Sequence, residues 1–98
     1  MRKLTYKIVE DTGSKITQRE VNGYHAFDMY GLAFGVEKDN HWDVTELSTG
    51  MKVTRGLHNT RKKAVKQALD TLRNVGEGTT IECVTKQHKR LVDLGVLN

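Results

Sequence analysis

The feature that most constrains the fold is an apolar stripe at helical spacing that begins after Thr60. Asn59 or Thr60 is suited to cap the start of a helix, and Gly76 is suited to end it. We therefore predict a helix over residues 60–75 that packs one face against the rest of the chain. The apolar residues of that face, spaced three and four apart, are Ala64, Val65, Ala68, Leu69, Leu72 and Val75.

The residues before this helix alternate between apolar and polar side chains, as half-buried strands do. The alternation is clearest over residues 4–9, 15–21, 24–37, 42–47 and 51–55. Asn22-Gly23 is a strong signal for a two-residue hairpin turn, and Gly31 is expected to insert a bulge into a long or interrupted strand over residues 24–37. Asn40 and Gly50 lie in the turns expected before and after the fourth strand. Residues 3–55 are thus predicted to form an antiparallel meander of about four to five strands.

A second helix is expected over residues 80–94. Thr79 and Glu82 have the spacing of a capping box, and apolar side chains recur after them at helical intervals. Because residues 79–84 are rich in β-branched side chains, a strand there is the open alternative. The predicted fold is α+β, with the meander packed on the helix over 60–75 and the second helix at the C-terminal end, all in a single domain over residues 1–98.

Composition limits the possible chemistry. The four His residues lie far apart in the chain, so no metal site and no cofactor are expected. Across the predicted hairpin, Asp39 could face Asp43 and Glu37 could face Glu46, but solvated charges are the commoner outcome, and we expect no enzyme.

The single cysteine and the lengths of the apolar runs bear on cellular location. The single Cys83 cannot form an internal disulfide and is expected to be a small buried structural residue. No apolar run is long enough for a signal peptide core or a membrane span, so a cytoplasmic protein with no membrane partner is expected.

The start of the predicted helix is unusually basic. Arg61, Lys62 and Lys63 occupy the first turn, where unpaired N–H groups and the helix dipole favour anions. A phosphate group would be a suitable partner. With a formal net charge of +4, the chain is suited to a polyanion. The predicted nucleic-acid-binding residues are Arg61, Lys62, Lys63, Lys66, Arg55, Lys52 and His58.

Residues 42–72 resemble the strand-strand-helix half of double-stranded-RNA-binding domains, over about thirty residues. In that family the helix opens with a Ser-Lys-Lys-x-Ala-Lys type of motif, and Thr60-Arg61-Lys62-Lys63-Ala64-Val65-Lys66 looks like that opening. The resemblance implies that Lys62, Lys63 and Lys66 bind phosphates, with Arg61 in support. The string Trp42 to Gly50 also resembles strands of HicB-like antitoxin domains and of small proteins from Gram-positive phages and mobile elements.

These observations favour a small non-enzymatic protein that binds nucleic-acid backbone phosphates, in duplex RNA or DNA, through the basic start of the helix. The alternative is a phage or mobile-element accessory protein that acts by protein–protein interaction, as an inhibitor or adaptor of a host or defence complex or as a sheet-edge dimer. A third reading is that the basic face only keeps the domain soluble.

Overall fold

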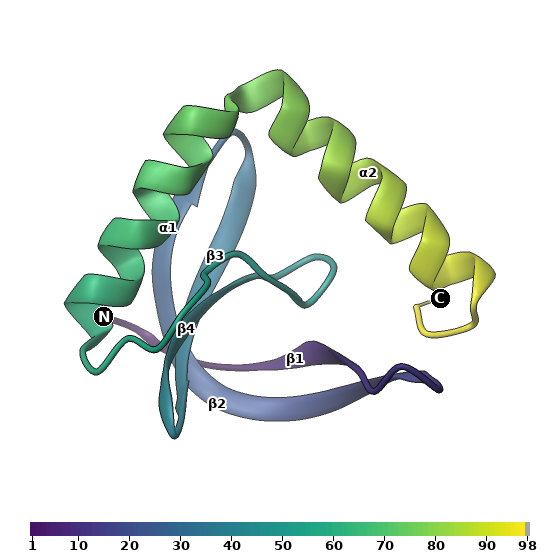
Figure 1. The fold of residues 1–98 in the computed structure, drawn as a ribbon, viewed down its shortest axis with the longest axis horizontal. Coiled ribbons are helices and arrows are strands. Elements are labelled where there is room, and N and C mark those ends of the chain that lie inside the picture. Colours follow the sequence, from purple (N-terminus) through teal and green to yellow (C-terminus); the bar gives the residue numbers. More distant parts are fainter. Residues whose placement is uncertain (98) are drawn as a thin grey trace.

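A five-stranded antiparallel sheet and two helices form the structure, a computed structural model that describes residues 1–97 (Figure 1). The strands lie in the sheet in chain order, which confirms the predicted α+β meander. The sheet curls so far that its two edges meet. The Val9 N–H near one edge donates a hydrogen bond of 2.9 Å to the Gly50 carbonyl near the other edge. The elements are β1 (Lys3–Asp11), β2 (Ile16–Met29), β3 (Leu32–Asp39), β4 (His41–Glu46), β5 (Met51–Lys52), α1 (Arg61–Val75) and α2 (Glu77–Asp93).

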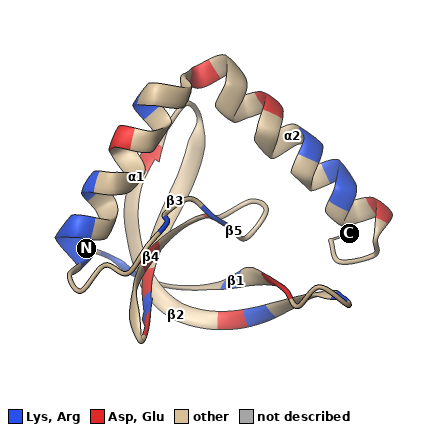
Figure 2. Ribbon diagram, viewed as in Figure 1, with Lys and Arg blue, Asp and Glu red and all other residues tan. Residues whose placement is uncertain are grey.

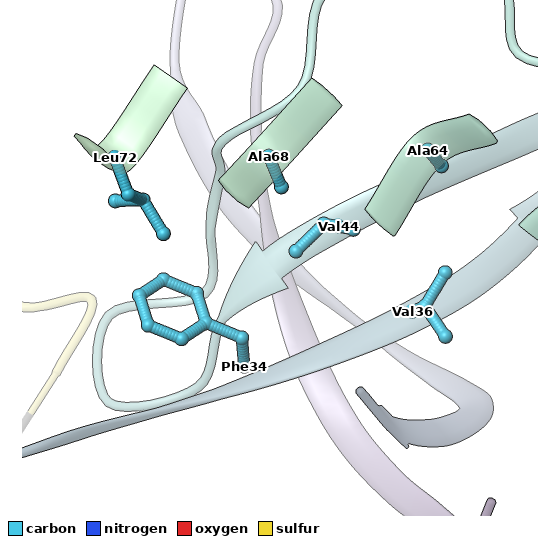
Figure 3. Packing of buried hydrophobic residues seen from close by; sticks show 6 residues of the cluster. All are labelled: Phe34, Val36, Val44, Ala64, Ala68 and Leu72. Carbon is cyan, nitrogen blue, oxygen red and sulfur yellow. The ribbon is translucent and has the colours of Figure 1, made fainter. Parts of the chain in front are cut away.

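Helix α1 packs on one face of β3 and β4, which we call the helix face. The Thr60 hydroxyl caps α1 by accepting a hydrogen bond from the Lys63 N–H, and Gly76 ends the helix with a φ of 87°. Small side chains on α1 let its backbone come close to the strands. Figure 3 shows this buried cluster, which consists of Phe34, Val36, Val44, Ala64, Ala68 and Leu72.

Three predicted members of the apolar stripe on α1 lie outside this buried cluster: Val65 and Leu69 are half-buried, and Val75 is exposed. Val75 is 44% exposed, because it ends the helix beyond the part that packs on the sheet.

A bulge in β2 completes the core. The register of β2 against β3 shifts between His25 and Phe27, so one extra residue is inserted at this point. Because side chains alternate along a strand, the insertion moves Phe27 onto the helix face, where its ring stacks on Phe34 with centroids 4.8 Å apart.

The prediction of a hairpin turn at Asn22-Gly23 is wrong. Both residues lie inside β2 and pair with Thr5 and Leu4 of β1. The glycine serves a close contact instead of a turn, since a Cβ on Gly23 would lie 2.5 Å from the Tyr6 hydroxyl and 2.6 Å from the Val36 carbonyl oxygen. The β1–β2 turn falls earlier, around Gly13, whose φ is 86°.

The bulge expected at Gly31 is also wrong. Tyr30 and Gly31 form the turn between β2 and β3, with φ values of 58° and 76°. Two successive positive φ values suit the twist of a tight hairpin, so the predicted long or interrupted strand over 24–37 is two paired strands.

Helix α2 starts at Glu77, three residues before the predicted start. The predicted capping box of Thr79 and Glu82 is wrong, because both residues lie inside the helix, whose cap position is Gly76 and has no side-chain cap hydrogen bond. The alternative of a strand over 79–84 is wrong as well, since this segment is helical. Cys83 is exposed rather than buried, because it lines an open groove between α2 and the rest of the chain. Among residues 1–97, neither helix is long and apolar enough to cross a membrane.

Two glycine substitutions test the packing of β2. Gly23→Ala is expected to lower the free energy of unfolding by about 1–3 kcal/mol, because the added methyl group meets backbone as well as the Tyr6 ring. Gly78→Ala in α2, where no atom lies within 4 Å of the added Cβ, is expected to raise it by about 0.5 kcal/mol. Urea denaturation of both variants measures the difference. A Gly23→Ala variant as stable as the wild type would contradict the close contact.

Candidate nucleic-acid interface

The first turn of α1 presents three exposed cations. Arg61, Lys62 and Lys63 follow the Thr60 cap, and the turn contains no acidic residue. Among residues 1–97, neither Lys62 nor Lys63 makes an ion pair. The positive end of the helix dipole adds to their charge, so this turn attracts anions from solution.

Arg61 is held in place by aromatic side chains. Its guanidinium carbon lies 4.8 Å from the ring centroid of Tyr24 and 5.7 Å from that of Trp42. Such cation–π contacts orient the guanidinium but leave its N–H groups able to donate hydrogen bonds. The two rings lie at the edge of the core, 6.5 Å apart, and connect the start of α1 to β2 and β4.

The remaining predicted residue on α1 is less available. The Lys66 ammonium lies 2.8 Å from the Asp70 carboxylate, and their hydrogen bond holds the pKa of Asp70 below its usual value. Both side chains are exposed, so this pair is weak and a phosphate could compete for the lysine.

Arg55 and His58 lie in the loop before α1, and the loop is tied to the helix. The Nε2–H of His58 lies 2.8 Å from the Arg55 carbonyl oxygen and 2.9 Å from Oε1 of Gln67. The Arg55 N–H donates to the same Gln67 oxygen. The His58 ring is therefore engaged by its own loop, whereas the Arg55 side chain is exposed.

Lys52 is not brought to this surface. It pairs with Thr45 in the sheet, so its side chain leaves the face opposite α1, and its ammonium lies 3.2 Å from the Asp43 carboxylate. Of the seven predicted binding residues, Lys52 is the one that the structure places with a different group of side chains.

One cation that was not predicted lies beside the start of α1. Lys3 pairs with Tyr24, on whose ring Arg61 lies. Only the register of β1 against β2 reveals this proximity, and the misplaced turn at Asn22-Gly23 concealed it. We call the group formed by Lys3, Arg61, Lys62 and Lys63 the basic surface.

A second group of cations lies on α2. Figure 2 shows Lys and Arg both at the start of α1 and in the C-terminal half of α2, at opposite sides of the molecule. The α2 residues are Lys86, Lys89 and Arg90, and Lys86 is paired with Glu82 at 2.8 Å. The two groups do not merge into one surface.

The face of the sheet opposite α1, which we call the inner face, holds a polar network. The Tyr6 hydroxyl donates to the Glu37 carboxylate at 2.5 Å, and the Thr45 hydroxyl donates to the same carboxylate at 3.0 Å. Burial raises the pKa of Glu37 above its usual 4.5, and burial together with the Glu37 carboxylate raises that of Tyr6 above 10.0. The network therefore ties β1 to β3 and β4.

The neighbouring carboxylate on the inner face is Asp43. It pairs with Glu37 across the β3–β4 hairpin, accepts a hydrogen bond from Thr54, and lies within 3.2 Å of the His41 and Lys52 nitrogens. The carboxylate pairs considered from the sequence are wrong, because the register instead pairs Asp39 with His41 and Glu46 with Phe34.

Comparisons with protein-family models, curated proteins and solved structures found no match to this chain. The resemblance of residues 42–72 to double-stranded-RNA-binding domains therefore stays a prediction. The fold and its surface define an α+β meander domain with a basic helix start.

The buried carboxylate gives a pH-dependent test. The folded protein holds the Glu37 proton more tightly than the unfolded chain does, because burial disfavours the charged form. The contribution of Glu37 to stability is therefore greatest below pH 4.5 and is lost as the pH rises through its folded-state pKa. Glu37→Gln removes this titration, so the stability of the wild type relative to the variant is expected to fall with rising pH. Urea denaturation of both proteins at several pH values between about 4 and 8 measures it, and parallel pH profiles would contradict the assignment.

Proposed function

We propose that this protein binds the backbone phosphates of nucleic acid through the basic surface. The observation that carries the proposal is the exposed first turn of α1, where Lys62 and Lys63 lack acidic partners among residues 1–97. A helix start with cations and no counter-charge is mildly unfavourable, by roughly 0.3–1 kcal/mol for each cation, until an anion binds there. Lys3 adds a cation from β1 and extends the surface beyond the helix.

Binding through phosphates has a characteristic salt dependence. Each neutralised phosphate releases condensed counterions, so the logarithm of the association constant falls linearly with the logarithm of the salt concentration. If about four phosphates are contacted, the slope is expected to be about −3 to −4. Such contacts position the protein on the strand and read little of its sequence.

A matched pair of charge-reversed variants tests this function. Lys62→Glu/Lys63→Glu is expected to weaken binding to a fluorescein-labelled oligonucleotide at least tenfold and to flatten the salt slope by about two, because two phosphate contacts are lost. The control, Lys86→Glu/Lys89→Glu on α2, has the same net charge but leaves the basic surface intact. Fluorescence anisotropy over a salt series measures both. Equal losses in the two variants, or no binding by the wild type to any DNA or RNA, would overturn the proposal.

The second candidate is protein–protein interaction without nucleic-acid contact, as in an accessory protein of a phage or mobile element. It is favoured by an apolar groove of about 180 Å³ between α1, α2 and β5. Val75, which lines this groove, is 44% exposed. The two candidates use different surfaces, so the Lys62→Glu/Lys63→Glu variant would keep a partner bound in the groove and lose a nucleic acid.

A further inference from the structure

A hollow of about 460 Å³ lies between the first residues of β1 and the middle of β2. Its exposed side chains come from the helix face, because Lys3 pairs with Tyr24 and Thr5 pairs with Asn22 across the two strands. Helix α1 packs on β3 and β4, so it leaves this part of the helix face uncovered. The residues that line the hollow are Lys3, Leu4, Thr5, Asn22, Gly23 and Tyr24.

The hollow adjoins the basic surface directly. Tyr24 lines the hollow and also carries the Arg61 guanidinium, 4.8 Å from its ring centroid. Lys3 belongs to both the hollow and the basic surface. A strand whose phosphates contact Arg61 and Lys3 would therefore have its bases next to Tyr24.

The chemistry of the lining suits a nucleobase. Tyr24 offers an aromatic ring for stacking, and stacking on an aromatic side chain is tolerant of base identity. The Asn22 carbonyl oxygen accepts a hydrogen bond of 2.9 Å from the Thr5 hydroxyl, which leaves the Asn22 amide N–H groups to donate. Base carbonyl oxygens and ring nitrogens are the acceptors that such a donor would meet.

We propose that the basic surface binds single-stranded nucleic acid, and that the hollow between β1 and β2 holds one unstacked base of that strand beside Tyr24. This inference rests on the proposed function and narrows its ligand. A base inside a duplex is stacked on both sides and paired along its edge, so it cannot enter the hollow unless the duplex opens. A single strand pays much less for turning one base outward.

Binding of matched ligands tests the inference. Fluorescein-labelled ten-nucleotide single strands of DNA and of RNA are compared with the corresponding duplexes and with a strand in which every base is replaced by an abasic sugar. The single strands are expected to bind about tenfold more tightly than both the duplexes and the abasic strand, because only an unpaired base can stack beside Tyr24. Comparison of DNA with RNA distinguishes the two sources of the strand.

Substitutions of residues that line the hollow give a second test of the inference. Asn22→Val is expected to weaken single-strand binding about five- to tenfold while binding of the abasic strand and the salt slope stay unchanged. Tyr24→Leu is expected to weaken single-strand binding as well, and because the Tyr24 ring also holds Arg61, it is expected to weaken binding of the abasic strand to a smaller extent. Gln18→Val, on the same strand outside the hollow, serves as the control. Because the Asn22 side chain is exposed, Asn22→Val is expected to fold normally. Its effect on binding therefore tests the hollow even if Tyr24→Leu folds poorly.

The outcomes separate the two proposals. Equal affinity for single strand, duplex and abasic strand, with loss only in Lys62→Glu/Lys63→Glu, would overturn the hollow and leave phosphate binding in place. Absence of binding to every ligand would overturn both. The proposal that the hollow holds a base would also be overturned if Gln18→Val weakened single-strand binding as much as Asn22→Val does.

Discussion

The close packing of α1 on β3 and β4 determines where every other part of the molecule lies. Ala64 and Ala68 are fully buried against the sheet, and side chains this small let the helix axis come near the strands. The first turn of α1 is thereby held beside Tyr24 and Trp42, on which Arg61 lies. A larger residue at either alanine would move the basic first turn as well as loosen the core.

The curl of the sheet depends on a second set of contacts, on the inner face. Tyr6 lies over two glycines, since a Cβ on Gly35 would come within 2.7 Å of its ring, and its hydroxyl reaches Glu37. The buried carboxylate is satisfied by two hydroxyl groups, which offsets the cost of its burial. The inner face therefore stabilises the arrangement in which β1, and with it Lys3, lies near α1.

Local sequence signals predicted some of these features and could not predict others. The helix over 60–75 was predictable because its cap, its apolar spacing and its terminating glycine all lie within one short segment. The turn at Asn22-Gly23 was not, because the glycine is required by Tyr6, seventeen residues away, and no local pattern distinguishes the two uses of glycine. The same reason applies to the site. Arg61, Lys62 and Lys63 follow from the helix, whereas Lys3 and the hollow follow only from the register of β1 against β2.

Trp42 has a position with a practical consequence. It is the only tryptophan of the chain, it packs against the buried core, and the Arg61 guanidinium lies over its ring. Its fluorescence therefore responds to two different events: exposure of the core when the protein unfolds, and displacement of Arg61 when an anion draws the guanidinium away. The chain thus contains an intrinsic probe that can report occupancy of its surface without any attached label.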